Sequence, residues 1–104
     1  DVVAFTQSDF GRTLTSNGDG TDHGWGAHQL VLGGAVAGRE IYGRMPRLEI
    51  GGPDDVGGGR IVPTLSVDQY AATLLRWFGL GEAQLDAVLP NLGNFPARDV
   101  GFVA

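Results

Sequence analysis

The stretch SDFGRTLTSNGDGTDHGWGAHQLVLGG, residues 8–34, gathers acidic, basic and imidazole side chains among closely spaced glycines. It contains both histidines of the chain, His23 and His28. It begins where a short apolar run ends, and it leaves through a second apolar run. Glycine-rich polar loops between strands are where α/β proteins place their chemistry, because the strand ends are rigid while the loops can take many shapes. We therefore predict a metal or oxyanion site in this stretch.

The two flanking apolar runs predict strands. Residues 2–6 (VVAFT) read as a buried strand, of the kind found in parallel sheets. Asp9 would then lie just beyond its carboxyl end, where open α/β sheets bind ligands. Residues 28–32 (HQLVL) form the second strand candidate. Between the runs, residues 13–20 contain two successive turn signals but no clean alternating pattern, so we expect a loop there instead of a hairpin.

The rest of the chain predicts an exposed glycine-rich loop over residues 43–59 and two helices. Ser66 and Gln69 form a capping box before a helix over residues 67–78, and Gly79 ends it. Tyr70, Leu74, Trp77 and Phe78 recur at helical spacing, which predicts the core-facing side. Residues 82–89 predict a second, shorter helix before Pro90. The expected fold class is α/β, with few short strands plus two helices, in a single domain over residues 1–104.

Composition and charge exclude several functions. The 104 residues carry a net charge of -5 with seven positive residues, all of them arginine, which argues against a nucleic-acid partner. The absence of cysteine excludes disulfides, thiolate metal sites and cysteine nucleophiles. No apolar run approaches the roughly 18 residues that a transmembrane helix needs. Because the chain opens inside an expected strand, we expect it to be the C-terminal part of a longer protein.

Asp9, Asp22 and His23 are the candidate metal ligands, since zinc and other divalent metals bind carboxylate oxygen and imidazole nitrogen. The alternative is that Asp22 is a turn residue and that His23 bonds to the backbone. Arg12 and His28 are candidates for binding an anionic substrate. Arg12 could clamp the anion with its planar fork or form a structural ion pair, and His28 could equally be a structural histidine.

Several motifs together resemble one known family. They are SDFGRT (8–13), NGDGTDHGWG (17–26), LVLGGAV (30–36), REIYGRMP (39–46), VPTLSVDQYAATLLRWFGL (62–80) and VLPNLGNF (88–95). The chain resembles the C-terminal part of the DUF1501 family, exported bacterial proteins of unassigned function. That family is similar to the alkaline phosphatase and sulfatase superfamily of α/β/α metalloenzymes, which hydrolyse or transfer phosphate and sulfate esters.

The resemblance implies a metal site and leaves its alignment open. Asp9 could be the strand-end ligand, with Phe10 where the superfamily usually has histidine and with His23 or His28 as the later ligand. Alternatively, Asp22-His23-Gly24 could itself be the Asp-His pair. The superfamily's Ser or Thr nucleophile would lie outside these residues, in the N-terminal part of the same fold. The resemblance thus implies a metal-dependent hydrolase of small anionic esters, using zinc or else manganese, magnesium or calcium, that is exported to the periplasm or cell envelope. The alternative, favoured by Phe10, is an exported non-catalytic binding or structural module with a degenerate metal site. Under either interpretation we expect the 104 residues alone to be inactive.

Overall fold

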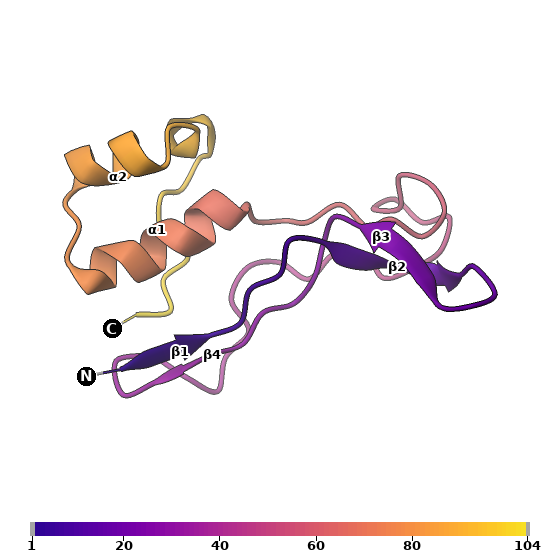
Figure 1. Cartoon of the computed structure of the whole chain (residues 1–104), viewed down its shortest axis with the longest axis horizontal. Helices are drawn as coiled ribbons and strands as arrows, with labels where there is room; N and C mark the ends of the chain where they lie inside the picture. The colour runs from indigo at the N-terminus through magenta and orange to yellow at the C-terminus, as the bar shows by residue number, and fades with distance from the viewer. Residues whose placement is uncertain (1, 104) are drawn as a thin grey trace. The chain divides into compact units, whose positions relative to one another are not determined.

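The computed structural model describes residues 2–103, which form two compact units. The helical unit comprises residues 2–4, 31–43 and 65–103 of this range, and the hairpin unit comprises residues 5–30 and 44–64. The described residues contain mixed short strands and two α-helices, which confirms the predicted α/β class (Figure 1). The assignment of the whole chain to one domain stays a prediction. No helix among the described residues has the length and apolar character needed to cross a bilayer.

Helix α1 (Val67–Phe78) has the bounds that the sequence predicts. The Gln69 amide donates to Ser66 Oγ at 3.1 Å, and the Ser66 amide donates to Gln69 Oε1 at 2.9 Å, so the predicted capping box is confirmed. At the other end Gly79 adopts φ 119°, a left-handed conformation that glycine accepts without a Cβ clash. Local signals at both ends therefore fix this helix.

The core of the helical unit lies between α1, α2 (Glu82–Val88) and the 3-10 helix η1 (Leu92–Asn94). Ala72, Leu85 and Leu92 are fully buried there, with partly buried leucines packed around them. The second helix matches its prediction to within one residue, because Leu89 is its C-cap. This small apolar cluster is what holds the two helices together.

The buried face of α1 differs from the predicted stripe. Phe78 is 76% exposed, whereas Gln69 and Thr73 are buried beside Ala72 and Leu74. The stripe prediction was therefore wrong in part, since of its four members only Leu74 is buried. The physical reason is that this face also meets the polar backbone of the C-terminal segment, where hydrogen-bonding side chains satisfy buried groups better than apolar ones.

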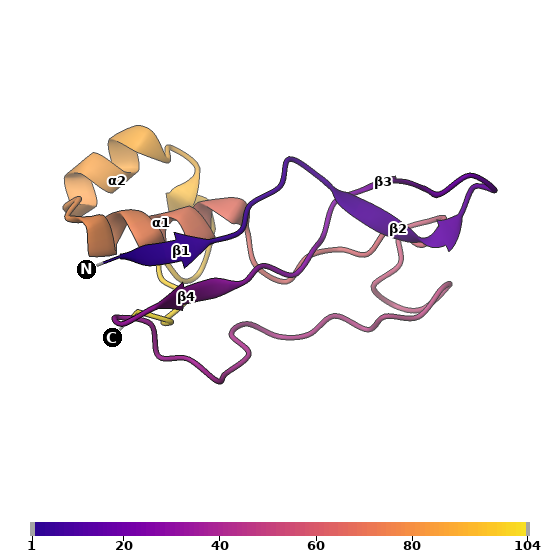
Figure 2. The same ribbon diagram turned by 60° about the horizontal axis from the view of Figure 1, so that its bottom comes forward.

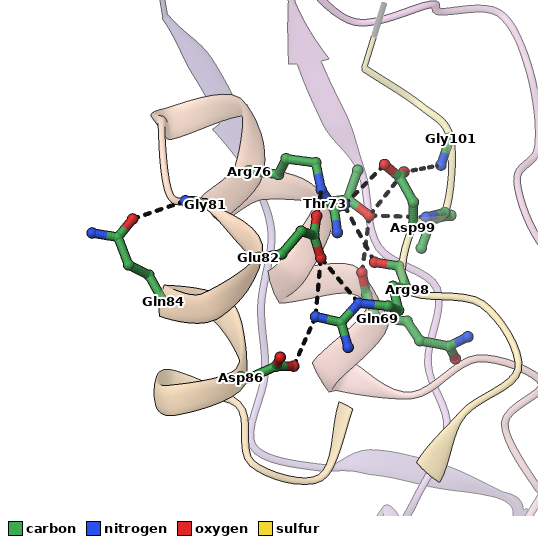
Figure 3. A network of polar contacts seen from close by, with 11 residues as sticks. Gln69, Thr73, Arg76, Gly81, Glu82, Gln84, Asp86, Arg98, Asp99 and Gly101 are labelled. Carbon is green, nitrogen blue, oxygen red and sulfur yellow. Dashed lines mark hydrogen bonds and ion pairs between the residues drawn. The ribbon is translucent and has the colours of Figure 1, made fainter. Parts of the chain in front are cut away.

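A polar network attaches the C-terminal segment, residues 96–103, to the helices (Figure 3). Gln69 Nε2 donates to the Ala97 carbonyl at 2.8 Å, and the Thr73 hydroxyl accepts from the Val100 backbone amide at 2.9 Å. Two arginines add ion pairs that connect α1, α2 and this segment: Arg76 with Glu82 and Asp99, and Arg98 with Glu82 and Asp86. The segment continues to Phe102, which is buried.

Replacing Thr73 with valine should destabilise the helical unit by about 1–3 kcal/mol. Valine has nearly the same shape, but it leaves the part-buried Val100 amide without its acceptor. Urea denaturation followed by circular dichroism measures the loss, and Thr73→Ser, which keeps the hydroxyl, should restore most of it. Equal stability of Thr73→Val and the parent would show that the hydroxyl does not hold the segment.

Strand β1 (Val3–Phe5) pairs with β4 (Val31–Gly33) in a two-stranded sheet. Both strands fall within or beside their predicted ranges, but their arrows run in opposite directions in Figures 1 and 2, so the pair is antiparallel. Phe5 is 48% and Leu32 is 68% exposed. The prediction of a buried parallel strand was therefore wrong for the described residues. A continuous apolar run gives a strand's position, but neither its direction nor what covers it.

The hairpin unit is built on β2 (Gly11–Ser16) and β3 (Thr21–Gly24), which pair antiparallel around residues 17–20. The prediction of a loop over residues 13–20 was wrong for residues 13–16, which belong to β2, and right for residues 17–20, which form the turn. Along β2 the buried positions are Gly11 and Thr13, while Leu14 is exposed. Apolar periodicity therefore gave no strand signal, because small and hydroxyl side chains occupy the covered face.

The segment of residues 44–64 lies against β2. The Leu14 amide donates to the Gly59 carbonyl at 2.9 Å, and Thr15 Oγ1 donates to the Gly58 carbonyl at 2.6 Å. The turn that presents these carbonyls is centred on Asp55, whose carboxylate accepts from the amides of Gly51, Gly57 and Gly59 at 2.8–3.1 Å. The glycine-rich run is thus an ordered turn, although most of its residues are exposed as predicted.

Acid should loosen this turn. Hydrogen bonds from backbone amides hold the pKa of the Asp55 carboxyl below its ordinary value, because they favour its charged form. The bond from Gly51 has the largest effect, and the bond from Gly57 comes next. A carboxylate with a lowered pKa stabilises the fold at pH values above its unfolded pKa, and this contribution is lost as the pH falls through the folded value. The amide NMR signals of Gly57 and Gly59 should therefore shift together below about pH 4. In Asp55→Asn that shared transition should be absent, and its persistence there would exclude Asp55 as the cause.

Candidate functional site

The base of the hairpin brings three side chains into one stack. The rings of Phe10 and His23 lie 3.9 Å apart between centroids, with their planes inclined by 18°. The Arg12 guanidinium carbon lies 5.2 Å from the centroid of Phe10. Arg12 and His23 are also register partners across β2 and β3. Two of the predicted site residues, Arg12 and His23, thus contact the same aromatic ring, that of Phe10. The sequence had marked Phe10 only as a replacement for an expected histidine.

Arg12 is anchored within the hairpin. Its Nη1 donates to the Thr21 carbonyl at 2.8 Å, and its side chain is exposed. A guanidinium carries five N–H donors in a rigid fork, so one bond to the backbone leaves others for an anion. The alternative of a structural ion pair is not seen, because Arg12 contacts no carboxylate among residues 2–103.

The two predicted carboxylate ligands differ in their surroundings. Asp22 Oδ1 accepts from Asn17 Nδ2 at 2.9 Å, a contact that supports the turn, so the alternative role of Asp22 is present in the structure. Asp9 is exposed and has no hydrogen bond or ion pair to any other described residue. Because successive side chains of a strand point to opposite faces, Asp22 and its neighbour His23 project from different faces of β3. Asp9 directly precedes Phe10 in the chain.

Within residues 2–103, His28 makes no ring contact or hydrogen bond with Phe10, Arg12 or His23, and its neighbour is Met45. Its Nε2 atom is 3.0 Å from Met45 Sδ, and both side chains are exposed. The structure therefore gives His28 a thioether neighbour that sequence reasoning missed. Residues 17 positions apart in two irregular segments offer no local signal for such a contact.

The stack residues fit a divalent cation in chemistry but not in number. Stacking uses the face of the His23 ring and leaves its in-plane nitrogens available, and His23 makes no hydrogen bond within the described part of the chain. The Asp9 carboxylate is likewise available. Over residues 2–103, however, no group of three or more His, Cys, Asp or Glu side chains is placed to hold a metal ion. The chain by itself thus offers at most a partial ligand set.

Three glycines allow the strands to approach closely at the hairpin base. A Cβ atom on Gly11 would lie 1.9 Å from the Gly26 carbonyl oxygen, and one on Gly24 would lie 3.1 Å from the Arg12 backbone. Gly26 in turn abuts the Ile61 carbonyl. These glycines fix where Phe10, Arg12 and His23 stand, because no side chain separates the backbones that carry them.

The tight turn at the other end of the hairpin holds one further acidic residue, Asp19. The Asn17 amide donates to the Gly20 carbonyl at 2.9 Å, and Asn17 Oδ1 accepts from the Asp19 amide at 3.0 Å. Gly18 and Gly20 have φ values of 96° and 146°, which other residues rarely adopt. The turn is therefore closed by its own side chains and backbone, and it accounts for the position of Asp19 without a ligand.

Comparison with known protein families gives one match. The model of the family described as "Protein of unknown function (DUF1501)" matches residues 1–88. The chain belongs to the DUF1501 family. The matched range includes the hairpin with its stack as well as helices α1 and α2, so the family pattern covers both units of this DUF1501 chain. The family description assigns no activity. No curated protein and no solved structure matched the chain.

Proposed function

We propose that this DUF1501 chain is the C-terminal part of an exported, metal-dependent hydrolase of phosphate or sulfate esters. Asp9 and His23 would each supply one ligand to a divalent metal, and ligands from outside these 104 residues would complete the set. The observation that supports the proposal is that both groups are exposed and lack hydrogen-bond partners among the described residues, and that His23 is the register partner of Arg12, which has free donors. A catalytic metal site needs such unengaged donors.

The donor chemistry favours zinc, with manganese, magnesium or calcium as the other candidates. When bound, such a metal polarises an ester oxygen and lowers the pKa of a bound water. Arg12 would hold the anionic group of the substrate, since its guanidinium fork matches two oxygens of a phosphate or sulfate. Phe10, whose ring contacts both groups, would keep the guanidinium and the imidazole in fixed positions. Asp22, through its second oxygen, and His28 are weaker candidates for ligand and substrate contact.

Phe10 also supports the second candidate function, an exported binding or structural module with a degenerate metal site. Its ring covers one face of His23 and is itself unable to ligate a metal. In this case the stack would serve the hairpin alone, and Arg12 would stabilise it by its cation–π contact, worth about 0.5–1 kcal/mol at an exposed position.

An ester screen of the full-length protein separates the two candidates. We expect chelator-sensitive hydrolysis of p-nitrophenyl phosphate or p-nitrophenyl sulfate, and a loss of about 10–100-fold in kcat/KM in Arg12→Ala, because a charge-assisted contact to the substrate is removed. Arg39→Ala, an exposed arginine elsewhere in the chain, is the matched control and should keep its activity. A folded protein that hydrolyses neither ester with any of the four metals would overturn the hydrolase proposal and favour the module.

A further inference from the structure

The function proposed above makes no use of Met45, and it gives His28 only a weaker candidate role. The 3.0 Å separation joins the Nε2 atom of an imidazole to the sulfur of a thioether, both on the surface of the hairpin unit. His28 lies three residues before β4, and Met45 is the second residue of the segment 44–64. Met45 is the single methionine of the chain, and the chain has no cysteine. These are therefore the chain's only thioether and one of its two imidazoles, placed side by side.

Nitrogen and thioether sulfur together are selective ligands. Thioethers are soft donors that favour Cu(I), whereas Mg²⁺, Ca²⁺ and Mn²⁺ prefer oxygen. Imidazole binds soft and borderline metals alike. Methionine has three rotatable bonds, so its sulfur can move outward to admit an ion between the two atoms. Monovalent d¹⁰ ions accept low coordination numbers, so a pair of such ligands with open access to solvent is sufficient to bind one.

We propose that His28 and Met45 form a binding site for a soft monovalent cation, Cu(I). The ion would bind the lone pair of His28 Nε2 and one lone pair of Met45 Sδ, with the imidazole proton on Nδ1. No bond to Asp9 or His23 is needed, so the site is independent of the proposed hydrolase. It would give His28 a ligand role toward a metal of a different class from the one expected at the stack.

The simpler explanation is a hydrogen bond in which the Nε2–H donates to sulfur. Thioether sulfur is a weak acceptor, and both side chains could bond to water instead, so such a contact contributes little. The two explanations differ in what a soft cation does to the pair. A metal site binds the cation through both residues, whereas a hydrogen-bonded pair has no preference for it.

Silver(I) is a suitable probe because it is soft, monovalent and inert to oxidation in air. We would titrate the intact protein, labelled with ¹³C in its methionine methyl groups, and assign the Met45 signal with Met45→Leu. Silver should shift the NMR signals of the Met45 methyl and the His28 ring protons together. Both shifts should reach their final values at one bound silver ion per His28–Met45 pair. His28→Ala and Met45→Leu should each weaken this binding by about tenfold or more, since the loss of even an outer-sphere partner costs 10–100-fold.

His23→Ala is the matched control, because it removes the other histidine, and it should leave silver binding at Met45 unchanged. Zinc should not shift the Met45 methyl. An unshifted Met45 methyl, or an equal shift in His28→Ala, would overturn the proposal. Circular dichroism of the exposed-site variants checks that they fold. Met45→Leu keeps this result separate from the ester screen, since it leaves Asp9, Arg12, His23 and His28 in place.

Discussion

Gly11→Ala is expected to disrupt the hairpin base, with a loss of about 3 kcal/mol or more in the stability of the hairpin unit. The added Cβ would lie 1.9 Å from the Gly26 carbonyl oxygen, so one backbone must move. No flexible side chain stands there to give way. The displacement would move Arg12 and Phe10, the next residues on either side, away from His23. The upfield ring-current shift that Phe10 imposes on the His23 ring protons should therefore shrink, and NMR measures it directly.

Gly34→Ala is the control for this substitution. Gly34 also follows an apolar run, but a Cβ there meets no atom within 4 Å, so stability should change by less than about 0.5 kcal/mol. If Gly11→Ala kept both the parent's stability and the His23 shift, close backbone packing would not be what positions the stack.

Leu85→Ala is expected to cost the helical unit between about 2 and 5 kcal/mol. Leu85 is fully buried in the small cluster with Ala72 and Leu92, so truncation leaves a cavity lined by few remaining apolar groups. A core of this size has little else to compensate for the loss. Guanidinium denaturation, followed by the circular dichroism of the helices, would give the change in unfolding free energy.

Val88→Ala provides the comparison within the same helix. Val88 is 57% exposed, so its truncation should cost less than about 0.5 kcal/mol, helped by the higher helix propensity of alanine. Similar losses in the two variants would show that α2 does not pack through Leu85 as described.

Local signals in the sequence predicted the two helices well. Helix α1 follows from its capping box, its apolar spacing and Gly79, all of which lie within or beside the helix. The sequence did not predict which segment of the chain packs against each face of α1. Gln69 and Thr73 are buried because the distant residues Ala97 and Val100 need hydrogen bonds, and no periodic pattern encodes that requirement.

The hairpin and its stack were harder to predict. The turn signals at residues 17–20 were visible, but the covered positions of β2 are Gly11 and Thr13, which carry no hydrophobic signal. Asp9, Arg12 and His23 were identified as chemistry-bearing residues, and the hairpin register accounts for the meeting of Arg12 with His23. The contacts of Phe10 and Met45 depend on tertiary packing alone, so spacing in the sequence gave no indication of either.

The central claim, that Asp9 and His23 ligate a divalent metal in the complete protein, is tested most directly by elemental analysis. The full-length protein would be purified without added metal, in parallel with Asp9→Asn, His23→Ala and Asp19→Asn. The account predicts stoichiometric zinc, or another divalent metal, in the parent and in Asp19→Asn, which changes a residue of the hairpin turn. It predicts a loss of at least about tenfold in occupancy in the other two variants. A metal-free parent, or full occupancy in His23→Ala and Asp9→Asn, would contradict it.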